Sequence, residues 1–279
     1  MSGSKQKRSC AYCGGGELTR EHLIPQGYFD RTGGAAEYVA NIKVGVTTEK
    51  FLSSEPTIAD VCGCCNNGVL SRLDSYFLIL FDRYFSNVVV RGRRISFKFD
   101  FDKLFRWLLK MGYNMGRARR WDGIQNLEAC KDYIRFAAPR PNNITVLLQA
   151  ATPGFIPSSP PTEFPPEMFV VNAMRVPRLL KDFPFALHVG IHCYQFYALF
   201  HHSATKSSDR KSRVKAFQRR FLGAYELRPN KESIKIYPAS VTLWDLVNGP
   251  FWEAGWVQHL RHHLGYAPRD KLAKERFGE

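Results

Sequence analysis

The apolar residues of this chain follow two different periods. Over 69–85 and again over 101–118 they recur every three or four positions, as on one face of a helix. Beyond residue 140 the spacing tends towards two, in segments rich in β-branched and aromatic residues, which is typical of strands. The strands expected from this pattern are ITVLLQA (144–150), MFVVNAMRV (168–176), FALHVGIHCYQFYALF (185–200) and SIKIYPA (233–239).

The same pattern predicts how the chain is organised. Helices are expected to resume at about 208–222 and 242–264, and the six prolines of 152–166 predict an extended connection. The fold class expected is α+β: a small N-terminal module over 1–90, then a larger α+β domain over 91–279 with an antiparallel sheet and basic helices.

Composition supports a globular protein. The chain has 279 residues, of which 44% are hydrophobic, 14% aromatic and 23% charged, and this excludes a mainly disordered chain or a coiled-coil rod. No window approaches the roughly 18 uninterrupted apolar residues of a membrane helix, and the first ten residues are polar. We therefore expect a soluble, cytoplasmic protein without a membrane partner.

The cysteines suggest a metal site. Seven cysteines are present, and five of them fall in the first quarter of the chain, which a thiolate metal site in a reducing compartment explains better than disulfides do. Two C-x-x-C knuckles, Cys10/Cys13 and Cys62/Cys65, supply the four thiolates of a structural Zn²⁺. The 48-residue spacer is longer than in ordinary zinc fingers, and Cys64 is expected to be a spare thiol.

Between the two knuckles lies the sequence Glu-His-Leu-Ile-Pro (21–25), and an asparagine follows the second knuckle. This combination resembles the HNH endonucleases, whose zinc-containing members have a ββα-metal fold. The resemblance covers residues 8–80. It implies catalytic roles for three residues: His22 as the general base that deprotonates a water, and Glu21 and Asn66 as ligands of a catalytic divalent cation.

The resemblance leaves several positions open. Asn67 is the neighbour with which Asn66 could be confused, and Asp74 is either a further ligand or a solvated helix residue. The middle asparagine of the family falls at Thr57, so a backbone carbonyl or Thr57 itself would orient His22. Adjacent residues such as Glu21 and His22 can serve one site only where the backbone is extended or bent.

The chemistry expected of such a site is phosphodiester hydrolysis. A neutral imidazole can accept a proton at cellular pH. A cation held by one carboxylate and one amide oxygen keeps positions open for water and phosphate, which suits Mg²⁺ or Mn²⁺.

Positive charge is concentrated in two segments. The formal net charge is +15, yet residues 1–90 hold nine basic and nine acidic residues. Residues 91–120 hold ten basic against two acidic, and residues 201–220 seven against one. Such concentration predicts binding of a polyanion, with solvated helix faces as the alternative. The residues expected to contact nucleic acid are Arg91, Arg93, Arg94, Lys98, Arg117, Arg119, Arg120, Lys206, Arg210, Lys211, Arg213, Lys215, Arg219 and Arg220.

Other reactive residue types are expected to be structural. His188 and His192 would chelate a metal on a helix, but on a strand they lie about 13 Å apart. The histidines at 201–202 and 262–263 are expected at the surface, beside phosphate. The residues expected in the core are Cys130, Cys193, Trp107, Trp121, Trp244, Trp252 and Trp256.

The function expected from the sequence is a divalent-metal-dependent endonuclease that hydrolyses nucleic acid, with double-stranded DNA as substrate. A role in restriction or antiviral defence follows by analogy alone. The rival is a non-catalytic zinc-knuckle protein that binds nucleic acid, which would have no reason to gather Glu21, His22 and Asn66. Residues beyond 120 could also bind a ligand or a regulatory protein partner.

Overall fold

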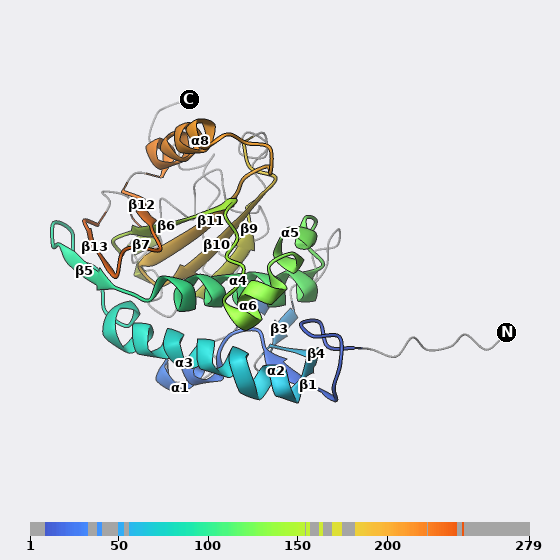
Figure 1. Cartoon of the computed structure of the whole chain (residues 1–279). Coiled ribbons are helices and arrows are strands. Elements are labelled where there is room, and N and C mark those ends of the chain that lie inside the picture. Colours follow the sequence, from blue (N-terminus) through green and yellow to red (C-terminus); the bar gives the residue numbers. More distant parts are fainter. Residues whose placement is uncertain are drawn as a thin grey trace, which may run out of the picture.

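The computed structural model describes residues 9–32, 38–40, 50–52, 56–153, 155–156, 162–163, 169–174, 182–221, 223–238 and 242. It confirms the α+β class, with helices and antiparallel sheets arranged in layers (Figure 1). Of the helix predicted over 242–264, the structure describes Thr242 alone, in an isolated bridge with Thr152; Trp244, Trp252, Trp256 and the histidines at 262–263 lie outside the described residues.

The N-terminal part consists of a strand pair followed by a long helical stretch. Strand β1 (Leu18–His22) pairs antiparallel with β4 (Thr57–Cys62), with a register shift between Thr19 and Glu21. Directly after β4 the chain turns helical through α2 (Gly63–Cys65), η1 (Asn66–Leu70), α3 (Ser71–Leu80) and η2 (Phe81–Phe85). Helix α1 (Gln26–Arg31) follows Pro25, and a small pair is formed by β2 (Tyr38–Ala40) and β3 (Lys50–Leu52).

Helix α4 (Phe101–Arg119) is the central element. The Asp100 side chain caps its first turn by accepting a hydrogen bond from the Lys103 amide at 3.1 Å. Nearly every side chain between Leu104 and Gly116 is buried, because the helix is covered on one side by α3 and on the other by the large sheet. The short helices α5 (Ile124–Glu128) and α6 (Lys131–Phe136) pack beside it.

The large sheet is antiparallel and has the strand order β12-β6-β11-β10-β9. Its strands are β6 (Ile144–Ala150), β9 (Phe169–Ala173), β10 (Phe185–Ile191), β11 (Tyr194–Phe200) and β12 (Tyr225–Leu227). The segment predicted as a strand over 185–200 is a tight hairpin, with the turn at His192, whose φ is 48°.

Alternating side chains of this sheet enter two separate cores. Leu187, Val189 and Phe196 face α4, whereas Leu147, Tyr197 and Leu199 face helix α8 (Ser207–Arg220). The layers therefore run in the order α3 with the β1–β4 pair, α4, sheet, α8, as Figure 1 shows. Helix α8 and the β1–β4 pair form opposite outer layers.

Two further strand pairs lie outside the large sheet. Strand β5 (Ile95–Lys98) pairs antiparallel with β13 (Ser233–Ile236), far apart in sequence. Strands β7 (Phe155–Ile156) and β8 (Thr162–Glu163) form a small pair within the proline-rich segment that was predicted to be an extended connection.

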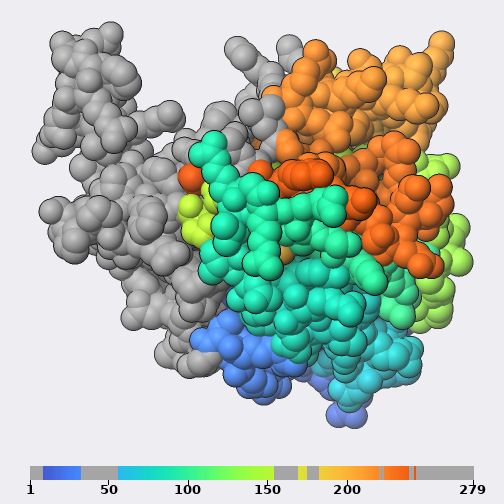
Figure 2. All heavy atoms as spheres, turned by 90° about the vertical axis from the view of Figure 1, so that its left-hand side faces the viewer, coloured from blue at the N-terminus to red at the C-terminus, as the bar shows by residue number. Residues whose placement is uncertain are grey.

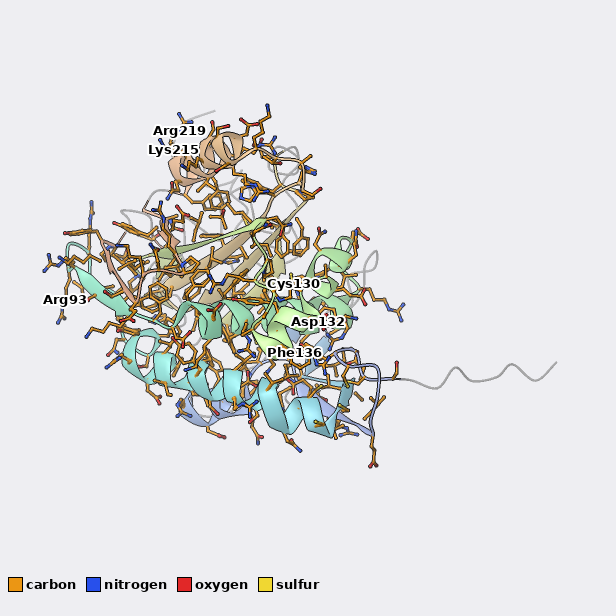
Figure 3. All side chains as sticks on the ribbon, viewed as in Figure 1. Arg93, Cys130, Asp132, Phe136, Lys215 and Arg219 are labelled. Atoms are coloured by element: carbon orange, nitrogen blue, oxygen red, sulfur yellow. The ribbon has the colours of Figure 1, made fainter. Side chains whose placement is uncertain are left out.

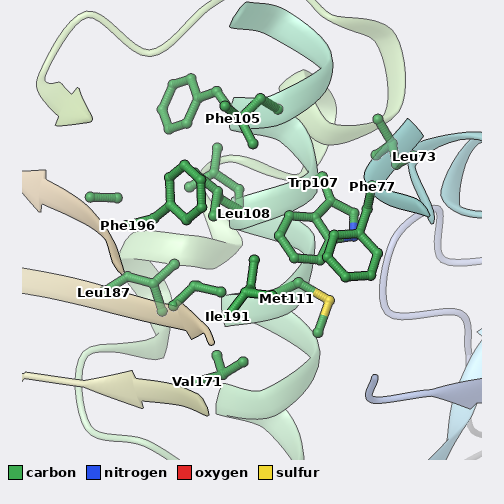
Figure 4. Close-up of a cluster of buried hydrophobic side chains, with 14 of the residues drawn as sticks. Leu73, Phe77, Phe105, Trp107, Leu108, Met111, Val171, Leu187, Ile191 and Phe196 are labelled. Atoms are coloured by element: carbon green, nitrogen blue, oxygen red, sulfur yellow. The ribbon is translucent and has the colours of Figure 1, made fainter. Parts of the chain in front are cut away.

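The apolar core on the α4 side is continuous across residue 90. Phe77 of α3 stacks on Trp107 of α4 with ring centroids 4.3 Å apart (Figure 4). Phe169 of β9 meets both rings edge-on. Trp121, Cys130 and Cys193 are buried, as predicted. The division at residue 90 stays a prediction about independent folding, and this shared core argues that the first part needs α4 to bury its apolar face.

Replacing Phe77 by alanine should destabilise the protein by about 3–5 kcal/mol, because the substitution leaves a cavity beside Trp107. Urea unfolding measures the loss. Phe136→Ala is the matched control: this ring is 63% exposed, so its removal should change the free energy of unfolding by less than about 0.5 kcal/mol. Equal effects of the two substitutions would contradict the shared core.

Candidate metal centre and the residues around it

The four predicted cysteines come together. The sulfurs of Cys10, Cys13, Cys62 and Cys65 all lie within 4.8 Å of one another, and those of Cys13 and Cys62 are 3.5 Å apart. Tetrahedral Zn²⁺ with sulfur ligands at about 2.3 Å requires sulfur separations of roughly 3.8 Å. The cluster can therefore hold a metal such as zinc, and the residues present fit that ion. Cys64 is exposed and outside the cluster, as predicted.

The backbone shapes the first knuckle around its sulfurs. The Gly14 amide donates to the Cys10 carbonyl at 2.7 Å, and Gly16 has a φ of 79°. A Cβ at Gly16 would lie 2.8 Å from the Cys62 Cβ, so only glycine allows this approach. Burial would raise the pKa of the Cys10 thiol, but hydrogen bonds from the backbone at Cys62, Cys13 and Tyr12 lower it to about 6. This favours the thiolate that a metal needs.

Glu21 lies on β1 with its side chain buried against α4. Its Oε1 accepts a hydrogen bond from the Lys110 ammonium at 2.7 Å and a longer one from the Asn114 amide at 3.3 Å. Burial raises the pKa of Glu21, an effect that Lys110 opposes. Both donors reach the same oxygen.

The Lys110 ammonium also contacts a second carboxylate, Asp74 of α3, with 2.5 Å between Nζ and Oδ2. Asp74 further accepts a hydrogen bond from the Trp107 indole at 3.2 Å. Although burial alone would lower the pKa of Lys110, Asp74 and Glu21 together raise it. Asp74 is thus part of an internal ion cluster, and not the solvated helix residue that was one of its two expected states.

Asn66 connects the helix start to strand β1. Its amide nitrogen donates to the Thr19 hydroxyl at 3.0 Å and to the Arg20 carbonyl at 2.9 Å. Because both bonds use Nδ2, the carbonyl oxygen Oδ1 is the atom of this side chain with ligand capacity. Asn67 is exposed, so the structure distinguishes the two asparagines: Asn66 is the one that contacts the strand.

His22 ends strand β1 and is half-buried. Its partner in the strand pair is Thr57, one of the two groups expected to orient it. The backbone at Glu21 and His22 is extended, one of the two conformations in which adjacent residues could serve one site from opposite sides. Successive strand residues project to opposite faces, so Glu21 points to α4 and His22 to the other side.

Lys110 and Asn114 were missed by sequence reasoning, which placed the basic positions of this helix in water. Lys110 is instead fully buried. The signal was present: Lys110, Asn114 and Arg117 recur at intervals of four and three residues and so form one stripe along α4. A polar stripe beside an apolar one predicts a second, polar packing face.

Arg117 completes this stripe and is also mostly buried. Its guanidinium forms two hydrogen bonds to Asp60 of β4, at 2.9 and 3.1 Å, and lies over the Tyr113 ring at 4.1 Å. These internal contacts differ from the phosphate contact expected of it. Arg119 is half-buried and Arg120, just after the helix, is exposed.

The remaining predicted basic residues occupy two distant places. Arg91, Arg93, Arg94 and Lys98 are exposed on and beside β5, whereas Lys206, Lys211, Lys215 and Arg219 are exposed on and beside α8. Figure 3 shows Arg93 at one edge of the molecule and Lys215 and Arg219 at another. Arg210 and Arg213 donate to the backbone carbonyls of Asn142 and Asp182, at 2.8 and 2.7 Å. The side chain of Arg220 lies outside the described part.

The histidines of the large sheet are internal. His188 lies on β10, as predicted, where its Nε2 is 2.8 Å from the Gln195 side-chain oxygen; burial lowers its pKa to about 4. The expectation for His201 is wrong: it is buried, 2.9 Å from the Thr145 hydroxyl, because the strand pairing draws it inward at the end of β11. His202 is exposed.

Comparison of the chain with protein-family models, with curated proteins and with solved structures finds no match. Among the helices of the described residues, none combines the length and apolar character required to cross a bilayer.

Cys65→Ser should abolish metal binding, because three thiolates leave the tetrahedral site incomplete. We expect about one zinc per chain in the wild type and close to none in the variant, by elemental analysis. Zinc contributes on the order of 10 kcal/mol to the folding of small zinc modules, so the melting temperature should also fall. Cys64→Ser is the matched control and should keep the zinc content and the melting temperature of the wild type. Equal zinc loss in the two variants would contradict the proposed set of four ligands.

The neutral state of His188 should make folding sensitive to acid. The pKa of His188 in the folded state is about 4, below the unfolded value near 6.5. Its contribution to the free energy of unfolding is therefore complete above pH 6.5 and is lost as the pH falls towards 4. At pH 5 the loss relative to pH 7.5 should be about 2 kcal/mol. Urea unfolding at both pH values measures it. His188→Gln should remove this component of the pH dependence, and His202→Gln should not.

Proposed function

We propose that this protein is a divalent-metal-dependent endonuclease of the HNH type. One observation carries the proposal: four cysteines bring together the loop before β1, the end of β4 and the start of the helical stretch, and Asn66 binds the strand that carries Glu21 and His22. This strand-strand-helix order is the one that the resemblance to zinc-containing HNH endonucleases implies.

His22 would act as the general base. It takes a proton from the water whose oxygen forms the new bond to phosphorus, while the bond from phosphorus to the leaving oxygen breaks. The half-buried position of His22 at the end of β1, opposite Thr57, gives it access to solvent together with a fixed backbone. A neutral imidazole can accept a proton at cellular pH.

Glu21 and Asn66 would hold the catalytic Mg²⁺ or Mn²⁺, which supplies the positive charge that offsets charge developing on the phosphate. The donor set fits this ion, since both side chains offer hard oxygen atoms. Lys110 and Asn114 occupy Oε1 of Glu21, so Oε2 would be the ligand atom. Two carboxylates around one ammonium leave the buried cluster with a formal charge of −1, which favours a nearby cation.

The proposed substrate is double-stranded DNA, and the proposed setting is the cytoplasm, in restriction or antiviral defence. The exposed cations beside β5 supply the attraction for a polyanion that the charge-neutral first 90 residues lack. Residues beyond 120 would carry specificity or the contact with a ligand or regulatory partner.

A second function is favoured by one observation. The Glu21 carboxylate is already paired with Lys110 inside the protein, which is how a structural residue behaves. A non-catalytic zinc-knuckle protein that binds nucleic acid would keep the cysteine cluster and the exposed cations, and would need no metal at Glu21.

Plasmid nicking in the presence of Mg²⁺ or Mn²⁺ separates the two functions. The wild type should convert supercoiled DNA to the nicked form, and His22→Ala should slow this by at least about 100-fold, the usual contribution of a general base. His202→Ala, an exposed histidine beyond the end of β11, is the matched control and should nick at the wild-type rate. Nicking that survives His22→Ala contradicts the mechanism, and a wild type inert on DNA and RNA favours the binding protein.

A further inference from the structure

Strands β5 and β13 form a two-stranded ribbon with one buried and one exposed face. In the register, Phe97 lies opposite Ile234 and Ile95 opposite Ile236, and Phe97 and Ile236 are fully buried. The exposed face carries the alternate positions, which are Ser96, Lys98, Ser233 and Lys235. All four of these side chains can donate hydrogen bonds to phosphate oxygens.

The loop before β5 extends this exposed face. Arg91, Arg93 and Arg94 are exposed there. Tyr237, which is 52% exposed, follows Ile236 and so lies at the same end of the ribbon as Arg94. In Figure 2 the residues around β5 and those around β13 adjoin on the surface. We call the set Arg91, Arg93, Arg94, Lys98, Lys235 and Tyr237 the ribbon surface.

Two features distinguish the ribbon surface from a merely solvated charge run. Within the described residues, none of the five cations of the ribbon surface forms an ion pair. Of the acidic residues nearby, Asp100 pairs with Lys103, and Glu232 directly precedes β13. Large apolar side chains are exposed beside the cations: Val88 at 52% and Val90 at 55%. Cations mixed with apolar and aromatic groups indicate a contact surface.

The helical stretch that begins at Asn66 leads to the ribbon surface. It runs from Asn66 to Phe85, with a kink at Gly68 and π-helical turns on either side of α3, so at the 1.5 Å per residue of an α-helix it spans at most about 30 Å. One turn of B-DNA measures roughly 34 Å. Figure 1 shows α3 leading from the β1–β4 pair towards β5. A duplex that follows this helix would meet the site at one end and the ribbon about one turn away.

We propose that the ribbon surface binds duplex DNA about one helical turn from the phosphate that is cut, with β5 and β13 entering the major groove, which has room for a two-stranded ribbon. This inference rests on the proposed endonuclease function. The proposal assigns the DNA contact to the basic segment around β5 and not to the one on α8. Helix α8 lies on the far side of the large sheet from β1 and so cannot contact the same stretch of a straight duplex.

The test compares two charge-reversal variants of the full chain. Lys98→Glu/Lys235→Glu changes the ribbon surface, and Lys211→Glu/Lys215→Glu makes the same change of net charge on α8. Binding of a labelled 20-bp duplex is measured by fluorescence anisotropy without Mg²⁺ or Mn²⁺. We expect the ribbon variant to bind at least tenfold more weakly, with a salt slope lower by about two, and the α8 variant to stay within about twofold of the wild type. Unchanged melting temperatures show that both variants are folded.

Duplex length gives a second readout. An 8-bp duplex, about 27 Å long at 3.4 Å per base pair, is too short to reach from the site to the ribbon. The ratio of its Kd to that of the 20-bp duplex should therefore be large for the wild type and the α8 variant, and smaller for the ribbon variant. Equal ratios in all three, equal weakening by both charge reversals, or a wild type that binds no DNA would overturn the inference.

The two proposals fail in different ways. If the wild type binds DNA through the ribbon surface but nicks nothing, the endonuclease proposal is wrong and the ribbon surface remains a DNA-binding site. If it nicks DNA and the ribbon variant nicks equally fast at subsaturating DNA, the ribbon inference is wrong and the nuclease stands.

Discussion

One buried ammonium joins the three parts of this protein on which the site depends. Lys110 of α4 lies between Glu21 of β1 and Asp74 of α3, at 2.7 and 2.5 Å. Charges are costly to bury, and they persist in a core only when each one has its partners. If Lys110 were lost, two carboxylates would remain without the cation between them. The position of the strand that carries Glu21 and His22 is therefore coupled to helix α4.

This coupling changes how the first 90 residues should be viewed. The cysteine cluster fixes the loop at Cys10, the end of β4 and the helix start relative to one another, but it does not supply a core. Phe77 and its neighbours obtain their apolar partners from α4 and β9. Polar contacts also join α4 to the strand pair, because Lys110, Asn114 and Arg117 all point from α4 towards β1 and β4. The cysteine cluster and a shared core thus lie on either side of one strand pair.

The order of the layers places the two basic segments of the chain on different parts of the protein surface. Basic residues near 91–98 and near 206–219 contribute to the same excess charge, yet the large sheet and α4 lie between α8 and the strand of His22. A surface that acts on a single DNA segment has to be contiguous in space. The exposed ribbon of β5 and β13 is contiguous because its strands pair, and it brings Lys235 and Tyr237 beside residues that lie more than 130 positions earlier in the chain.

The sequence by itself determined the α+β class, the helices over 69–85 and 101–118, four of the five strands of the large sheet, and the four cysteines of the cluster. These features depend on local periodicity or on short, fixed spacings. The tertiary structure alone decided the burial of Lys110, Arg117 and His201, the hairpin within 185–200 and the pairing of β5 with β13. A side chain's charge state and exposure depend on elements that approach from elsewhere in the chain, and no local pattern specifies those approaches. Glu21 and His22 illustrate this difference. Their adjacency in the sequence is local, but the burial of Glu21 and the partial exposure of His22 depend on where α4 packs against their strand.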